Sequence, residues 1–131
     1  MIEERCRILY VDDHDDSAEM LKLILADADY EVETARSVEQ ALQMAAERAF
    51  DLYVLDKRLP DGSGLELLKR LNALTPDVPC VVYTGDAYEL HRKEALAAGA
   101  DAYVAKPDIE KLIQTVNNFL SQRACATAGS A

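Results

Sequence analysis

Residues 52–64 read LYVLDKRLPDGSG. The apolar run over residues 50–55 predicts a short, buried strand, and the proline and glycines that follow Asp56 predict a turn. Asp56 therefore stands at the carboxyl end of a buried strand, where a loop opens. Residues that bind or react are often displayed at this position in α/β proteins, so Asp56 is the first candidate for chemistry.

Strand-like apolar runs alternate with helix-like periodic segments along the rest of the chain. Further strands are expected at residues 7–11, 31–35, 79–83 and 101–105, and helices at about 15–28, 37–46, 63–75, 86–98 and 108–120. Asp86 and Asp108 are the expected N-caps of the fourth and fifth helices. The alternation implies parallel crossover units with helices on both faces of one sheet. Five strands suit a flavodoxin-like (βα)5 fold, an α/β class with strand order 2-1-3-4-5.

In a sheet of that order, the ligand crevice lies at the carboxyl ends of the first and third strands. Asp12 and Asp13 follow the first strand, and Asp56 follows the third. Thr84 and Lys106 follow the fourth and fifth strands, at the same edge of the sheet. The predicted topology therefore gathers three carboxylates, a hydroxyl and an ammonium group in one place.

The three carboxylates repel one another, by about 4 kcal/mol for each pair at about 4 Å and an effective dielectric of about 20. A bound cation relieves this repulsion, and an all-oxygen ligand set suits a hard ion, Mg²⁺ or alternatively Mn²⁺. Such an ion brings the oxygens of a phosphoryl donor next to Asp56, which can act as nucleophile and form an acyl phosphate. Lys106 supplies positive charge opposite the metal.

Each of these residues also has a purely structural explanation when it is considered alone. Asp12 and Asp13 could cap the following helix. Asp56 and Thr84 could be turn residues, and Lys106 could be a solvated lysine. Their common position at the ends of four strands argues against coincidence and favours a single site.

The composition limits the classes of function. At 131 residues the chain is long enough for one domain with its own core, expected at residues 1–123, with a flexible tail or linker stub at 124–131. The net charge is −10, from 24 acidic and 14 basic residues, which argues against direct binding of nucleic acid. The sequence has no signal peptide and no apolar stretch near the length of a membrane span, so a cytoplasmic protein without membrane contact is expected.

Four motifs together strongly resemble the receiver domain of two-component response regulators. They are Val11-Asp12-Asp13, Leu55-Asp56 with residues 59–62, Tyr83-Thr84-Gly85, and residues 99–107 (GADAYVAKP). The resemblance covers about residues 5–122. It implies that Asp56 is the phosphoacceptor, that Asp13 binds Mg²⁺ directly and Asp12 through water, and that the main-chain carbonyl of Arg58 is a further ligand.

The resemblance also implies how the signal is read. Lys106 is expected to contact the phosphoryl group, Thr84 to bond to it, and Tyr103 to be the mobile aromatic residue of the switch. The Lys106–Pro107 peptide bond is expected to be cis. Residues 86–98 carry few large aliphatic side chains, which suits a segment that rearranges. Partners are therefore expected to read the state at the face made by the fourth helix, the fifth strand and the fifth helix.

The expected function is a phosphorylation-dependent switch that assists its own phosphorylation and dephosphorylation, rather than an enzyme acting on other substrates. The phosphoryl group would come from a sensor histidine kinase, a phosphotransfer protein or a small phosphodonor. The state would pass to a downstream protein or an output domain, or to a second copy of the chain in a homodimer. Lys57 departs from the family, which usually has an apolar residue after the phosphoacceptor. Lys57 and Arg58 add two cations that bear on the phosphoryl lifetime.

Three alternatives follow from the same residues. An Mg²⁺-dependent phosphatase or phosphotransferase with an aspartate nucleophile usually has a second acid two positions later, where this chain has Arg58. A phosphate-independent receiver-like binding module would not need the complete set of five polar site residues. A flavin-binding protein would need a Ser/Thr/Gly-rich phosphate loop after the first strand, where residues 13–16 (DHDD) would repel a phosphate.

Overall fold

A central parallel sheet organises the molecule. The computed structural model describes residues 5–86 and 88–121. Over these residues the order of the five-stranded sheet is β2-β1-β3-β6-β7. Its strands are β1 (Arg7–Val11), β2 (Glu31–Ala35), β3 (Leu52–Leu55), β6 (Cys80–Thr84) and β7 (Ala102–Ala105). Since β6 and β7 are the fourth and fifth strands of this sheet, the predicted order 2-1-3-4-5 is confirmed.

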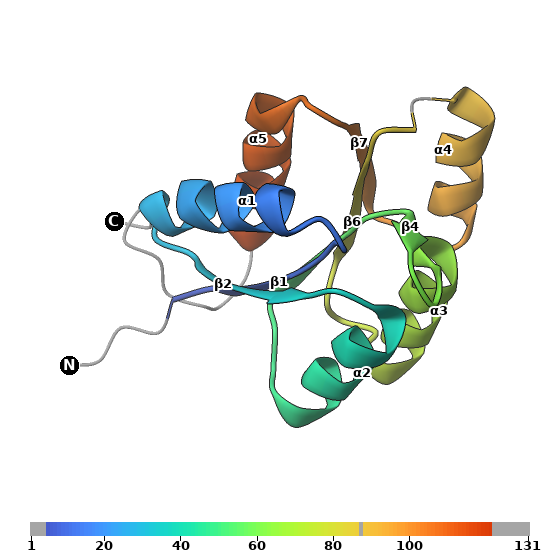
Figure 1. Cartoon of the computed structure of the whole chain (residues 1–131), viewed down its shortest axis with the longest axis horizontal. Coiled ribbons are helices and arrows are strands. Elements are labelled where there is room, and N and C mark those ends of the chain that lie inside the picture. Colours follow the sequence, from blue (N-terminus) through green and yellow to red (C-terminus); the bar gives the residue numbers. More distant parts are fainter. Residues whose placement is uncertain (1–4, 87, 122–131) are drawn as a thin grey trace.

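Helices cover both faces of the sheet (Figure 1). They are α1 (Asp15–Asp27), α2 (Val38–Glu47), α3 (Gly64–Leu74), α4 (Glu89–Ala97) and α5 (Ile109–Leu120). Ile8 and Tyr10 of β1 lie in the apolar cluster shared with α1 and α5. Leu9 and Val11 lie in the opposite cluster, which includes residues of α2, α3 and α4. The alternation of side chains along β1 therefore divides the core into two layers.

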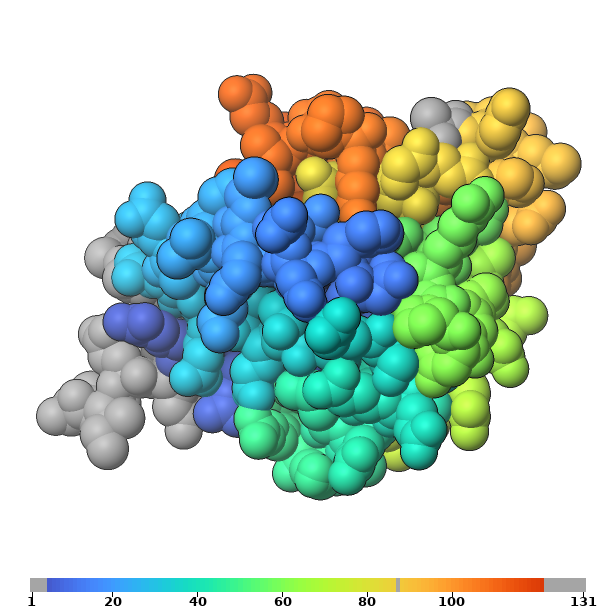
Figure 2. Space-filling model, viewed as in Figure 1, coloured from blue at the N-terminus to red at the C-terminus, as the bar shows by residue number. Residues whose placement is uncertain are grey.

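The strands are nearly continuous apolar runs because both faces are covered. All residues of β3 and β6 are buried, as are four of the five residues of β1. In the space-filling view, atoms with the colours of α1, α2 and α3 make up much of the visible surface on either side of the strands (Figure 2). This burial leaves the ends of the strands, rather than their faces, as the place where polar side chains meet.

The predicted cap Asp108 of α5 is confirmed, and two serines cap further helices. The side chains of Ser37, Ser63 and Asp108 accept hydrogen bonds from main-chain N–H groups in the first turns of α2, α3 and α5. Gly99 follows α4 with a φ of 115°. This lies in the left-handed region, which glycine adopts at helix ends.

Two local features differ from the sequence prediction. The prediction that Asp86 caps α4 is wrong, because the helix begins at Glu89 and its N-cap residue is Tyr88. The Asp86 carboxylate instead accepts the main-chain N–H of Tyr88 at 3.0 Å and binds side chains of other elements. The loop after Asp56 also contains a small antiparallel hairpin, β4 (Arg58–Leu59) and β5 (Gly62–Ser63). Strands of two residues are too short to show a periodic pattern.

None of the described helices combines the length and the apolar composition needed to cross a membrane. The tail predicted at residues 124–131 lies outside the described residues.

Candidate functional site

The predicted site residues meet at the carboxyl edge of the sheet. Val11 pairs with Leu55 in the register of β1 and β3, so Asp12 and Asp56 leave their strands at the same level. Thr84, the last residue of β6, pairs with Ala105 of β7, and Lys106 follows directly. The topology therefore brings together side chains that lie up to 94 positions apart in the chain, as for Asp12 and Lys106.

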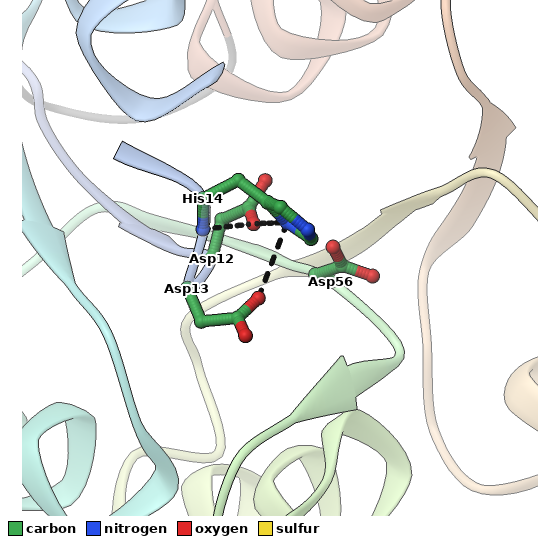
Figure 3. A group of neighbouring side chains, drawn as sticks. All are labelled: Asp12, Asp13, His14 and Asp56. Atoms are coloured by element: carbon green, nitrogen blue, oxygen red, sulfur yellow. Dashed lines mark hydrogen bonds and ion pairs between the residues drawn. The ribbon is translucent and has the colours of Figure 1, made fainter. Parts of the chain in front are cut away.

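Four side chains form a compact group at this edge. Asp12, Asp13, His14 and Asp56 each place one candidate ligand atom within 4.8 Å of the others. Figure 3 shows the three consecutive residues that follow β1 lying opposite Asp56. Asp12 and Asp56 are buried, with exposed fractions of 1% and 6%, whereas Asp13 is partly open to solvent and His14 is exposed.

The donor set of this group fits a divalent cation. Three carboxylates offer the hard oxygen atoms that Mg²⁺ prefers, and the exposed side of the group leaves room for the waters that Mg²⁺ retains. The imidazole of His14 was missed by the sequence prediction. Its Nδ1 lies 2.9 Å from Asp12 Oδ1 and 3.2 Å from Asp13 Oδ1. The contact with Asp12 is the main reason that the pKa of His14 is raised.

Lys106 links the two buried carboxylates. Its Nζ donates to Asp12 Oδ2 at 2.8 Å and to Asp56 Oδ2 at 3.1 Å. Burial by itself would lower the pKa of Lys106, but the hydrogen bond to Asp12 and the charge of Asp56 outweigh it and raise the pKa. The lysine therefore stays charged at neutral pH and lies directly against the predicted phosphoacceptor.

Asp12 is held ionised by its neighbours. Burial would raise its pKa, but hydrogen bonds from Lys106, Tyr10 and His14 lower it to about 2. The Tyr10 hydroxyl donates to Asp12 Oδ2 at 2.5 Å, and the main-chain N–H of His14 donates to Oδ1 at 3.0 Å. A fixed, ionised carboxylate is the form that can take part in cation binding.

A cleft with a volume of about 520 Å³ opens beside Asp56. Residues from four strand ends, the hairpin and α4 line it, among them Asp56, Arg58, Thr84, Asp86, His91 and Lys106. The lining brings together the phosphoacceptor candidate, the hydroxyl of Thr84 and the cationic side chains of Arg58 and Lys106. Such a cleft can admit an anionic group and hold it next to Asp56.

The second predicted switch residue, Tyr103, is buried in β7. Its hydroxyl donates to the main-chain carbonyl of Asp86 at 2.5 Å. The main-chain N–H of Asp86 lies 3.5 Å from Thr84 Oγ1. The two predicted switch residues therefore meet at the same short segment between β6 and α4.

Asp86 is a further site residue whose partners the sequence did not reveal. Its Oδ2 accepts from Lys57 Nζ at 2.8 Å and also contacts His91 Nδ1 of α4. The bond from Lys57 is the largest cause of its lowered pKa, followed by the N–H of Tyr88. Lys57, the residue that departs from the family pattern, thus ties the segment after Asp56 to the segment before α4.

Arg58 lines the cleft and is exposed. Its main-chain N–H lies 3.3 Å from Asp56 Oδ1. The role of the Arg58 main-chain carbonyl as a metal ligand stays a prediction. The Lys106–Pro107 peptide bond is cis, as the resemblance implied.

The fold and the site define a class of protein: a flavodoxin-like α/β domain with an acidic cluster and a lysine at the carboxyl edge of its sheet. The family model of the response regulator receiver domain matches residues 8–117. The chain belongs to this family, the receiver domains of two-component response regulators.

Curated relatives and solved structures agree with this assignment. The chain is 35% identical to the response regulator protein PilR of Pseudomonas aeruginosa over 120 residues, which are 91% of this chain and 27% of PilR. It is 39% identical to the phosphate regulon transcriptional regulatory protein PhoB of the same species over 102 residues, 76% of this chain and 44% of PhoB. The chain thus spans less than half the length of these two relatives.

A solved structure shows the same fold. A two-component response regulator from Clostridium difficile superposes with a TM-score of 0.86 at 28% sequence identity, covering 90% of this chain and 98% of that one. The parallel sheet described above is therefore the sheet of the receiver family.

Proposed function

We propose that this receiver domain accepts a phosphoryl group on Asp56 and reports it by a change of conformation. The observation that supports this assignment is the contact of Lys106 Nζ with Asp56 Oδ2 at 3.1 Å, beside the carboxylates of Asp12 and Asp13. A buried carboxylate that faces both an ammonium group and a cation site has the two charges that phosphoryl transfer requires around its nucleophile.

The side chains of Asp12, Asp13 and Asp56 would hold Mg²⁺, with the carbonyl of Arg58 as a further ligand. As the resemblance to the family implies, Asp13 would bind the ion directly and Asp12 through water; Asp13 is partly open to solvent, and Asp12 is buried. The ion supplies charge neutralisation and orients the incoming phosphoryl oxygens. An Asp56 carboxylate oxygen then bonds to phosphorus as the bond to the donor breaks, and Lys106 stabilises the transferred group.

The donor in this proposal is a phosphohistidine of a sensor kinase or phosphotransfer protein, or a small acyl phosphate. An output domain or a separate protein target would receive the signal. Phosphorylation-linked pairing of two copies is another way to pass it on. An aspartate-nucleophile phosphatase lacks support, because Arg58 stands where the second acid would be.

The signal would reach partners at the face of α4, β7 and α5. In α4 only Ala95 is buried, and the side chains of Tyr88 and Leu90 beside and within it are 74% and 66% exposed. A helix with so little buried apolar surface moves at low cost. Converting a 1:99 equilibrium to 99:1 takes about 5.5 kcal/mol. Two or three charge-assisted hydrogen bonds to the phosphoryl group, at roughly 1.5–3 kcal/mol each, are sufficient.

Incubation with a small acyl phosphate and Mg²⁺ tests the proposal. We expect the intact mass to increase by one phosphoryl group in the wild type and not in Asp56→Ala, because Asp56 is the carboxylate of the acidic cluster that lines the cleft beside Lys106. The same samples are expected to differ in amide hydrogen exchange over residues 84–98. An equal mass gain in both proteins would remove Asp56 as the acceptor, and an unchanged exchange profile would remove α4 as the reporting element.

A further inference from the structure

Tyr10 is a polar residue in the most buried part of the sheet. It lies in β1, two residues before Asp12, and its exposed fraction is zero. Because alternate residues of a strand point to the same side, Tyr10 and Asp12 share one face of β1. The aromatic ring packs in the apolar cluster with residues of α1 and α5. Burial is the largest cause of its raised pKa, followed by the bond to Asp12, so the phenol stays protonated as a donor.

The hydroxyl of Tyr10 is one of several donors that fix the Asp12 carboxylate. It reaches Oδ2 at 2.5 Å, and Lys106 Nζ reaches the same oxygen at 2.8 Å. Lys106 has a long, flexible side chain that is partly exposed, and its Nζ also donates a hydrogen bond to Asp56. The ring of Tyr10 is fully buried in the apolar cluster with residues of α1 and α5, so its hydroxyl has less freedom to move than the ammonium group of Lys106. It is therefore the less mobile donor to Oδ2.

We propose that Tyr10 is a positioning residue of the cation site. Its hydroxyl fixes the orientation of Asp12, which leaves Oδ1 directed toward Asp13 and His14 within the ligand group. It also keeps Oδ2 hydrogen-bonded when Lys106 turns from Asp12 to a phosphoryl group on Asp56, a second role that rests on the proposed function. An apolar residue at this position would fill the core equally well, but Lys106 would then be the sole side-chain donor to Oδ2 among the described residues.

The removal of one oxygen atom tests the proposal. Loss of an outer partner of a metal ligand lowers metal affinity by about 10–100-fold. Because Asp12 would itself act through water, we expect Tyr10→Phe to lie at the lower end of this range and to raise the dissociation constant for Mg²⁺ by about tenfold, as measured by isothermal titration calorimetry of the full chain. The affinity of Tyr10→Phe for beryllofluoride, a mimic of the phosphoryl group, should also fall in the presence of Mg²⁺. Without the Tyr10 hydroxyl, Lys106 is held more firmly at Asp12.

Tyr53→Phe is the matched control. Tyr53 is also fully buried, and its hydroxyl contacts Thr75 Oγ1 at 2.8 Å rather than the acidic group. This variant should bind Mg²⁺ and beryllofluoride as the wild type does, although it also loses a buried hydroxyl.

A second measurement needs no variant at the site. In wild-type protein with ¹³C-labelled tyrosine, Mg²⁺ should shift the NMR resonance of the hydroxyl-bearing carbon of Tyr10 and leave the resonance of the same carbon of Tyr53 unchanged.

Unchanged Mg²⁺ affinity in Tyr10→Phe, or an equal loss in Tyr53→Phe, overturns the proposal. If Tyr10→Phe does not fold, the absence of a Tyr10 shift in the labelled wild type overturns it, as does a wild type that binds no Mg²⁺. Phosphoryl uptake by the wild type is measured separately, as the increase in intact mass. Failure of Asp56 to accept a phosphoryl group would reject the proposed function while leaving the Mg²⁺ comparison intact. Normal uptake with unchanged affinity in Tyr10→Phe would reject the Tyr10 assignment alone.

Discussion

Replacement of Gly64 by alanine is expected to destabilise the fold strongly and to displace the phosphoacceptor. Gly64 is the first residue of α3, and a Cβ atom there would lie 2.1 Å from the main-chain oxygen of Asp56 and 2.9 Å from the Cα of Lys57. Its N–H also donates to the Lys57 carbonyl at 2.7 Å. The clash is with main chain on both counts, so no side-chain rotation relieves it. We expect a loss of about 3 kcal/mol or more, at the upper end of overpacking effects.

Gly85→Ala is the control for this substitution. A Cβ atom at Gly85 would meet nothing within 4 Å, although Gly85 also lines the cleft beside Asp56. Its effect on the free energy of unfolding should be within about 0.5 kcal/mol, as for most surface positions. Urea unfolding measures both variants, and phosphoryl uptake by the folded fraction reports the position of Asp56. Equal stability of the two variants would show that the close approach of α3 to Asp56 is absent.

The sheet order and the meeting of Asp12, Asp56, Thr84 and Lys106 could be predicted from sequence for a simple physical reason. Parallel strands that are buried on both faces appear as short apolar runs, and the first polar residue after each run marks its carboxyl end. Once the crossover rule fixes these ends at one edge, positions far apart in the chain become neighbours. No side-chain geometry is needed for that step.

The partners of individual polar groups could not be predicted in the same way. Asp86 precedes a helical segment, which favours a cap, but a local pattern does not show that Lys57 and His91 compete for its carboxylate. Tyr10 belongs to the apolar run that predicts its strand, although its spacing from Asp12 places the two side chains on one side of the chain. The same period-two argument that defines a strand could have identified this pair.

Replacement of Lys106 by methionine is expected to slow phosphoryl uptake by about 100-fold or more, which is the usual cost of removing one preorganised charge-stabilising group. Methionine retains much of the aliphatic stem and removes the ammonium group, which in the wild type lies 5.6 Å from the centre of the Tyr83 ring and donates to Asp12 and Asp56. Lys111→Met, at an exposed position of α5, is the matched control and should take up the phosphoryl group at the wild-type rate. Uptake is measured by intact mass over time with an acyl phosphate and Mg²⁺.

The same variant separates the role of Lys106 from that of the metal ligands. Loss of the ammonium leaves the carboxylates of Asp12 and Asp56 without their shared cation, so Mg²⁺ should bind as tightly as before or more tightly while phosphoryl uptake falls.

Because the folded-state pKa of Asp12 is lowered to about 2, its ionised form stabilises the fold above about pH 4, and this contribution is lost as the pH falls toward 2. Lys106→Met should therefore lower the free energy of unfolding more at pH 7 than at pH 3. Uptake at the wild-type rate, or an equal loss of stability at both pH values, would mean that Lys106 does not act on these two carboxylates.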